Sequence, residues 1–329
     1  MRGGIKRRQF IQLLSGAAVA WPLEARAQKA GRPVIGYLSS KGEAAEAGIL
    51  AGVRKGLGEQ GFTEGQNVAF EYHWGGGDYD KLPKLAAGLV ARDVDIIAAS
   101  GLPATLAAKA ATAKIPIIFR LAIDPIAFKL AQSFDRPGGN LTGVTMLFDP
   151  LTPKKLQLLH ELVSSASIGI LINPKNQNAV SHKAHAETAA AALGLRMTVL
   201  NASSGSELGP AFDHARQAKL GAILVGDDPL FDTESQRLVE AANRSKIPTM
   251  YYVRDFVVGG GLLSYGPSFD EMSYQVGIYA GRILKGAKAT ELPIVQPTKF
   301  ELVINRKAAR AIGLEIPSKL LFTADEVIE

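Results

Sequence analysis

Short apolar runs alternate with longer segments of helical periodicity from residue 34 onward. An apolar run of four or five residues is typical of a buried strand, and apolar positions three and four apart are typical of an amphipathic helix. The strands expected in the first half of the chain are residues 34–38, 67–74, 96–99 and 115–119. The helices expected between them are residues 44–60, 82–91 and an alanine-rich segment that starts near Pro103.

The same alternation repeats in the second half of the chain. Strands are expected at residues 168–172, 196–200, 222–225 and 248–252. Helices are expected at residues 179–193, 211–218 and 234–244. Strands that alternate with helices form a parallel sheet covered by helices on both faces. The repeat therefore predicts an α/β protein of two doubly wound parallel-sheet lobes with a cleft between them.

The expected lobes are residues 33–145 and residues 146–265, and residues 266–329 form a C-terminal segment that returns to the first lobe and crosses the hinge. The hinge candidates are residues 140–150 and 260–267, which are rich in glycine and proline. Two such lobes close on a small molecule by a hinge motion, with the ligand beyond the carboxyl ends of the strands.

Residues 1–27 have the pattern of a bacterial export signal. A basic start with the pair Arg7-Arg8 precedes an apolar run of small residues, and Ala25-Arg26-Ala27 has the form of a cleavage site. The apolar run is too short to span a bilayer of about 30 Å, so we expect no stable membrane insertion. The segment predicts a twin-arginine signal, removal of residues 1–27 and a periplasmic location.

Charge and cysteine content exclude several classes. Of the formal net charge of +6, residues 1–27 carry +4 and the remainder +2, so we expect no nucleic-acid partner. The chain of 329 residues has 0 cysteines, which excludes disulfides, thiolate zinc sites and a lipid-anchored cysteine.

The stretch from residue 95 to 112 contains the clearest ligand-site pattern. An apolar strand ends at Ser100-Gly101, and a helix starts near Pro103, where a missing N–H costs no hydrogen bond. The unpaired N–H groups of a helix start attract anions, and Ser100 and Thr105 add hydroxyls beside them. We interpret this turn as a seat for a ligand carboxylate; the alternative is an ordinary strand–helix turn.

Polar and aromatic residues recur at the ends of the expected strands, as a small-molecule site requires. Taken singly, each is also explained as a cap, a turn residue or core packing. The ligand-binding candidates are Ser39, Ser40, Trp74, Ser100, Gly101, Ala104, Thr105, Asp124, Asn173, Asp227, Tyr252 and Tyr265.

Enzymatic signatures are missing. The sequence has no G-x-x-x-x-G-K-[ST] motif and no G-x-G-x-x-G after a strand, and Ser264 lacks the first glycine of a nucleophile elbow. His182 and His185 lie one helical turn apart and could hold a metal, although a solvated helix face is the more common meaning of this spacing. We expect no catalytic residues, no metal and no cofactor.

Several segments resemble the TrpX-type family (ABC_sub_bind) of ABC-transporter substrate-binding proteins. They are Ser100-Gly-Leu-Pro-Ala104, Asp124-Pro125, the Phe-Asp-Arg-Pro-Gly-Gly-Asn-Leu-Thr-Gly-Val of residues 134–144, the Gly-Gly-Leu-Leu-Ser-Tyr-Gly of residues 260–266, the Gln-Pro-Thr-Lys-Phe-Glu-Leu-Val-Ile-Asn of residues 296–305, and residues 324–328. The resemblance covers essentially everything after the signal.

This resemblance implies a type I periplasmic-binding-protein fold and delivery of a small solute to an ABC permease in the inner membrane. It implies an amino acid or organic acid as ligand. The ligand carboxylate would lie at the turn of Ser100 to Thr105, and Asp124 would meet an amine. We expect a monomer.

Two other functions use the same two lobes. One is a receptor that passes its closed form to a membrane sensor kinase, which the sequence does not separate from an importer receptor. The other is an exported enzyme that processes a sugar or an amino acid, which the missing nucleophile and metal motifs disfavour.

Overall fold

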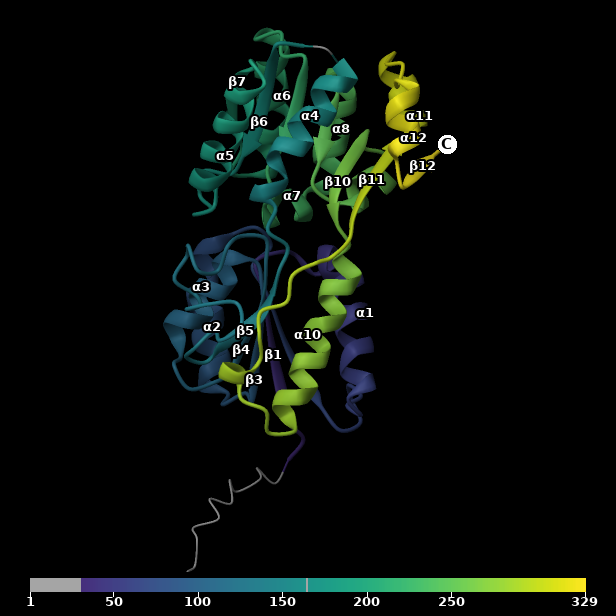
Figure 1. Ribbon diagram of the computed structural model, residues 1–329. Coiled ribbons are helices and arrows are strands. Elements are labelled where there is room, and N and C mark those ends of the chain that lie inside the picture. Colours follow the sequence, from purple (N-terminus) through teal and green to yellow (C-terminus); the bar gives the residue numbers. More distant parts are fainter. Residues whose placement is uncertain (1–30, 164) are drawn as a thin grey trace, which may run out of the picture. The chain divides into compact units, whose positions relative to one another are not determined.

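The fold is taken from a computed structural model that describes residues 31–163 and 165–329. The expected export signal, residues 1–27, lies outside the described residues. Pro33–Glu329 form one compact unit, which contains two lobes (Figure 1). No helix in the described part of the chain is both long enough and apolar enough to cross a membrane.

The first lobe is built on a parallel sheet with the strand order β2-β1-β3-β4-β5. Its strands are β1 (Val34–Ser39), β2 (Ala69–Trp74), β3 (Ile96–Ser100), β4 (Ile117–Leu121) and β5 (Leu141–Thr145). Helices α2 (Leu82–Ala91) and α3 (Leu102–Ala111) pack on one face, and α1 (Glu43–Glu59) and α10 (Phe269–Leu284) pack on the other. Both faces are therefore covered, which explains why these strands are apolar runs.

The second lobe is built on a sheet with the order β12-β11-β10-β9-β8-β6-β7. Its strands are β6 (Ser167–Ile172), β7 (Arg196–Asn201), β8 (Ala222–Val225), β9 (Thr249–Tyr251), β10 (Leu263–Pro267), β11 (Phe300–Asn305) and β12 (Glu326–Ile328). Its helices are α4 (Thr152–Val163), α5 (Ala179–Ala192), α6 (Leu208–Gln217), α7 (Pro229–Thr233), α8 (Ser235–Ser245), α9 (Arg254–Val258), α11 (Arg306–Ile312) and α12 (Ser318–Thr323). Strand β11 runs antiparallel to β10, and the other pairs are parallel.

The prediction of an α/β fold with two parallel-sheet lobes is confirmed. Parts of the two segments expected to be hinges are strands. Residues 141–145 form β5 and residues 263–267 form β10, although glycine and proline suggested connections. Both segments carry residues that are buried in the cores, such as Leu141 and Leu263, and tertiary packing overrides the turn propensity.

The backbone passes between the lobes three times in the described part of the chain. The passages follow β5, β10 and residue 295, which bridges to Val144 of β5 before the chain joins the second sheet as β11. Figure 1 shows the last passage as the yellow segment from the end of α10 to β11. Short 3-10 helices occur at η1 (Tyr79–Lys81), η2 (Asp149–Leu151), η3 (Gly205–Glu207) and η4 (Ala289–Glu291).

Helices α1 and α10 approach closely because glycines face each other across their contact. A Cβ atom on Gly56 would lie 2.1 Å from the Tyr274 carbonyl oxygen, and one on Gly277 would lie 2.1 Å from the Val53 carbonyl oxygen. These contacts are with backbone, so no side-chain rotation relieves them. The return of the chain to the first lobe therefore depends on bare backbone at these positions.

Gly56→Ala should lower the free energy of unfolding by about 1–3 kcal/mol, because the added methyl group forces α1 and α10 apart. Gly58→Ala is the matched control, since Gly58 lies two residues further along α1 with nothing within 4 Å of its Cβ position. That change should leave stability unchanged or raise it by up to about 1 kcal/mol. Urea unfolding of both variants tests this, and equal effects would contradict the close packing.

Candidate functional site

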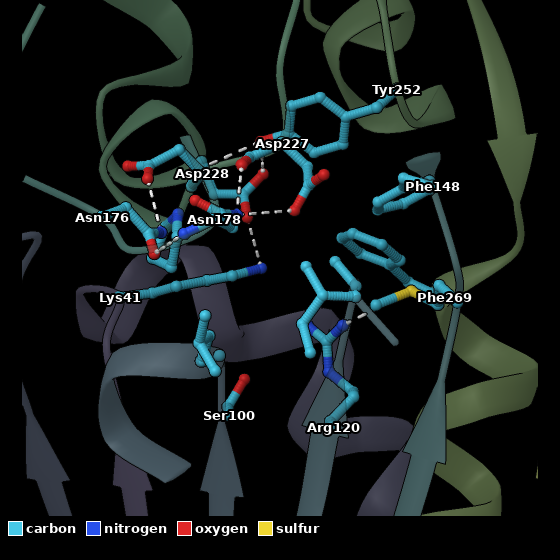
Figure 2. Close-up of a pocket in the computed structure, with 17 residues that line it drawn as sticks. Lys41, Ser100, Arg120, Phe148, Asn176, Asn178, Asp227, Asp228, Tyr252 and Phe269 are labelled. Carbon is cyan, nitrogen blue, oxygen red and sulfur yellow. Dashed lines mark hydrogen bonds and ion pairs between the residues drawn. The ribbon is translucent and has the colours of Figure 1, made fainter. Parts of the chain in front are cut away.

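A pocket lies where the carboxyl ends of the strands of the two lobes meet (Figure 2). The first lobe contributes residues that follow β1, β3 and β4, and the second lobe contributes residues that follow β6, β8 and β9. The lining residues are Lys41, Ser100, Gly101, Leu102, Arg120, Ala122, Ile123, Met146, Phe148, Asn176, Asn178, Asp227, Asp228, Pro229, Asp232, Tyr252 and Phe269. We call this space the interlobe pocket.

Arg120 is a buried cation in the wall of the interlobe pocket. It lies near the end of β4, has 4% of its surface exposed, and its guanidinium carbon is 4.5 Å from the centre of the Phe269 ring. Its Nη1 contacts the Met146 sulfur at 3.9 Å. Its Nε and Nη2 have no hydrogen-bond partner within the described residues. An arginine with free donors in a fixed plane fits a carboxylate, which it binds through two parallel hydrogen bonds.

Lys41, the other cation of the pocket, is already paired. Its Nζ lies 2.6 Å from Asp232 Oδ2, and the Tyr252 hydroxyl donates to Asp232 Oδ1 at 2.6 Å. Lys41 belongs to the first lobe and Asp232 to α7 of the second. This ion pair therefore joins the lobes across the pocket and leaves little free charge for a ligand.

The Asp228 carboxylate accepts hydrogen bonds from both lobes. The Tyr79 hydroxyl of the first lobe donates at 2.6 Å, and the side-chain amides of Asn173 and Asn176 and the Leu230 N–H of the second lobe donate at 3.1, 2.7 and 2.9 Å. Burial raises the pKa of Asp228 to about 6, although these donors act in the opposite direction. Asp228 is thus a structural acceptor that holds the two lobes together.

Asp227 is paired with a buried histidine. His182 on α5 has 6% of its surface exposed; its Nε2 lies 2.9 Å from Asp227 Oδ1 and its Nδ1 lies 2.6 Å from Asp149 Oδ1. Burial lowers the pKa of His182, but the two carboxylates outweigh burial and raise it to about 10. Asp227 Oδ2 has only a long contact of 3.5 Å with the Asn178 amide. Asp227 Oδ1 has the ion pair with His182 but no hydrogen-bond partner within the described residues, so the carboxylate can accept from another donor.

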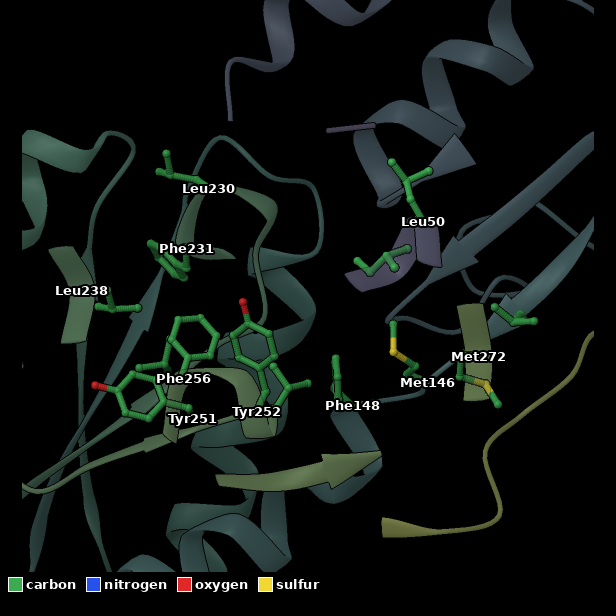
Figure 3. Packing of buried hydrophobic residues seen from close by; sticks show 14 of the residues in the cluster. Leu50, Met146, Phe148, Leu230, Phe231, Leu238, Tyr251, Tyr252, Phe256 and Met272 are labelled. Carbon is green, nitrogen blue, oxygen red and sulfur yellow. The ribbon is translucent and has the colours of Figure 1, made fainter. Parts of the chain in front are cut away.

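Aromatic rings form the apolar part of the wall. The Phe148 and Tyr252 rings lie 5.5 Å apart and tilted, and Tyr252 packs edge-on against Phe256 at 5.2 Å. Figure 3 shows these rings next to Tyr251, within a buried cluster that includes residues of both lobes. Rings packed in this way are held in place, so the pocket combines fixed apolar walls with a few directed polar groups.

The sequence also matches a known protein family. The family model for ABC transporter substrate binding proteins matches residues 41–328. The chain belongs to this family. The resemblance to its TrpX-type members is confirmed.

Relatives of this substrate-binding protein include the tyrosine-binding protein of Clostridioides difficile, which is 26% identical over 266 residues, 80% of this chain and 76% of the relative. Two solved structures are also 26% identical and cover 91% of this chain and 100% of their own. They are a conserved domain protein from Vibrio cholerae, with a TM-score of 0.83, and the ABC domain from Streptococcus pneumonia in complex with L-Trp, with a TM-score of 0.82.

A third structure, the ligand-free open form of a substrate-binding protein with adhesive properties from Clostridium difficile, supports the fold alone. Its TM-score is 0.63, with 23% identity over 90% of this chain and 99% of its own.

Four of the candidates named from the sequence line the interlobe pocket of this substrate-binding protein: Ser100, Gly101, Asp227 and Tyr252. Asn173 lies one contact further out, where it donates to Asp228. The strand-end pattern thus brings these five residues together from both lobes.

The remaining candidates lie outside the pocket lining and have contacts within their own lobe. The Ser39 hydroxyl donates to the buried Glu46 at 2.7 Å, and so does that of Ser100 at 2.9 Å. The Thr105 hydroxyl donates to the Gly101 carbonyl at 2.9 Å. These three hydroxyls donate inside the first lobe, although Ser100 also lines the pocket.

The other candidates outside the lining are engaged in similar ways. Ser40 Oγ accepts from the Ala104 N–H at 2.9 Å, so these two residues tie the start of α3 to the end of β1. Asp124 is exposed and accepts from the Ile126 N–H at 2.8 Å, as a turn residue does. The Trp74 ring stacks on the Tyr72 ring at 5.5 Å, and the ring of Tyr265 in β10 lies against the ring of Phe300 in β11.

Sequence reasoning missed Arg120, Lys41, Asp232 and Phe269. A signal for Arg120 was present, because it is the one charged residue in the apolar run of residues 117–121. Phe269 carried no such signal, since the return of α10 to the first lobe brings it to the pocket. The spacing of His182 and His185 was linked to a solvated helix face, and the structure instead buries His182 between two carboxylates. Within the described residues, no group of three or more His, Asp or Glu is arranged to hold a metal ion.

The ion pairs of His182 should make stability depend on pH. Its folded pKa of about 10 lies above the ordinary value of about 6.5, so the stabilisation is complete below pH 6.5 and is lost as the pH rises toward 10. His182→Gln should therefore lower the free energy of unfolding by on the order of 3–5 kcal/mol at pH 6 and by much less at pH 10. Urea unfolding of both proteins at pH 6, 8 and 10 measures this difference.

His185→Gln is the control, because His185 is half exposed and lies 3.5 Å from Asp149 without contacting Asp227. Lys155 also titrates in this range, since burial lowers its pKa to about 8, but it is present in all three proteins. A difference between wild type and His182→Gln that stays constant from pH 6 to 10 would contradict the ionised histidine.

Proposed function

We propose that this protein is the periplasmic solute receptor of an ABC importer and that it binds a small amino-acid-type solute in the interlobe pocket. It delivers this solute to an inner-membrane permease and does not alter it chemically. The observation that carries the proposal is the buried guanidinium of Arg120, which has donors without partners in the described chain and faces a pocket with aromatic walls.

The ligand carboxylate is assigned to Arg120. A buried charge without a partner costs several kcal/mol, and an anion that forms two hydrogen bonds to the guanidinium offsets that cost. Gly101 and Leu102, at the start of α3, line the same space, so the helix start adds its partial positive charge on the same side. The proposal thus keeps the expected carboxylate near this turn but gives the main role to Arg120.

The ligand ammonium group is assigned to Asp227. Asp228 and Asp232 are occupied by close contacts, whereas Asp227 Oδ2 has only the 3.5 Å contact with Asn178. Arg120 comes from the first lobe and Asp227 from the second, at the bottom and the top of Figure 2. A zwitterion between them would contact both lobes and stabilise the closed arrangement.

The relatives support an amino-acid ligand. One is named a tyrosine-binding protein, and another was solved in complex with L-Trp, each at 26% identity. The rings of Phe148, Tyr252 and Phe269 offer apolar surface of the kind that an aromatic side chain would contact.

Arg120→Met should weaken binding of the carboxylate by about 1.5–3 kcal/mol, which is more than tenfold in affinity. Calorimetry against the twenty L-amino acids first finds the tightest one for the wild type. That amino acid is then compared with its carboxamide in both proteins. The wild type should prefer the acid, and Arg120→Met should lose most of that preference.

Arg92→Met is the control, because Arg92 is exposed at the end of α2 and forms only a surface ion pair with Glu71. It should bind as the wild type does. An unchanged preference for the acid in Arg120→Met would contradict the assignment of the carboxylate. A ligand recovered in altered form after incubation would contradict the receptor function.

The periplasmic location is tested at the N-terminus. We expect export to remove residues 1–27, so the mature protein in a periplasmic extract should begin at Gln28. Replacing Arg7 and Arg8 with lysine should block export if the twin-arginine route is used, because that route reads the pair. N-terminal sequencing that finds Met1 in the periplasmic protein would contradict the signal.

A further inference from the structure

His182 links the wall of the interlobe pocket to the first passage between the lobes. Asp149 opens η2, directly after the passage that follows β5, and Asp227 follows β8 in the pocket wall. His182 on α5 contacts Asp149 through Nδ1 at 2.6 Å and Asp227 through Nε2 at 2.9 Å. The imidazole ring thus spans two carboxylates from separate elements, with 6% of its surface exposed.

Both contacts require the ring to donate from both nitrogens. Two carboxylates accept and do not donate, so the charged ring satisfies both, whereas a neutral ring satisfies one. The raised pKa of His182 agrees with this geometry. The other charged groups nearby are Lys155, which lies over the Phe148 ring at 4.8 Å, and His185, 3.5 Å from Asp149.

The pairing of His182 with Asp227 affects how the interlobe pocket can bind a ligand. Asp227, Asp228 and Asp232 all line the same space, and three unpaired carboxylates there would repel one another. Asp232 is paired with Lys41, and Asp228 is held by four neutral donors. His182 is the cation that contacts Asp227: its Nε2 lies 3.2 Å from the Asp227 backbone carbonyl oxygen and forms an ion pair with Oδ1 at 2.9 Å.

We infer that His182 is a positioning residue for the ligand's ammonium group, because it holds Asp227 through the backbone carbonyl and an ion pair at Oδ1 and leaves the carboxylate without a close hydrogen bond, free to receive that group. The inference rests on the proposed binding of an amino-acid-type solute. Through Asp149, the same ring fixes this acceptor relative to the passage between the lobes. His182 acts through Asp227 and does not line the pocket itself.

The test compares ligands that differ only in the ammonium group. The probes are L-tryptophan with 3-(indol-3-yl)propanoate, and L-tyrosine with 3-(4-hydroxyphenyl)propanoate. Calorimetry of His182→Gln should show at least about a tenfold loss for the amino acid and less than about a threefold loss for the des-amino acid. His185→Gln, on the same helix and also near Asp149, should bind both as the wild type does.

A double-mutant cycle shows whether His182 acts through Asp227. In an Asp227→Asn background, the further change His182→Gln should alter amino-acid affinity by less than about threefold, because the acceptor that it positions is already gone. An equal loss for the amino acid and the des-amino acid in His182→Gln, or a full loss in the Asp227→Asn background, would overturn the inference while the proposed function stands.

A wild-type measurement covers the case in which His182→Gln does not fold. With ¹⁵N-labelled histidine, NMR at pH 8.5 should detect one ring that is protonated at both nitrogens. L-Tryptophan should shift this ring's signals more than 3-(indol-3-yl)propanoate does. Absence of a doubly protonated ring, or equal shifts, would overturn the inference. A wild type that binds none of the four probes and none of the twenty L-amino acids would overturn the proposed function and this inference with it.

Discussion

The guanidinium of Arg120 is buried without a hydrogen-bonded counter-charge in the described chain, and the rest of the pocket is arranged around that feature. Removing a charge from water costs several kcal/mol unless a partner replaces the lost hydration. The acids of the pocket all have such partners: Asp227 has His182, and Asp232 has Lys41. An anion beside Arg120 would give the guanidinium a partner of opposite charge, which supports the proposed carboxylate ligand.

The partners of the pocket acids also decide how the lobes are held together. Lys41 and Tyr79 belong to the first lobe, and their acceptors, Asp232 and Asp228, belong to the second. The Gly42 N–H adds a hydrogen bond to Thr233 of α7 at 3.1 Å. Opening the lobes would remove the partners of these buried groups. Closure of the lobes and pairing of the pocket charges therefore both depend on the contacts of the short α7.

Alternation of strands and helices was enough to predict two parallel-sheet lobes, because inner strands such as β3 and β6 are buried apolar runs between covering helices. It failed at β5 and β10, where buried residues such as Leu141 outweigh glycine and proline. For the site, strand ends located Ser100 and Asp227. A sequence does not show toward which acceptor a hydroxyl points. It also contains no pattern that singles out Phe269, because Phe269 reaches the pocket only through the return of α10 to the first lobe.

The backbone donors of the turn after β3 are engaged within the first lobe. The Gly101 N–H donates to the Arg120 carbonyl at 3.0 Å, and the Ala104 N–H donates to Ser40 Oγ. Gly101 adopts φ of 91°, a left-handed backbone that glycine tolerates without strain. These donors join the ends of β1, β3 and β4, so they are used in fixing Arg120 rather than in meeting a ligand. A full charge on a fixed fork of donors also exceeds the partial charge of a helix end. The turn therefore places the guanidinium of Arg120, to which we assign the charge that would meet a ligand carboxylate.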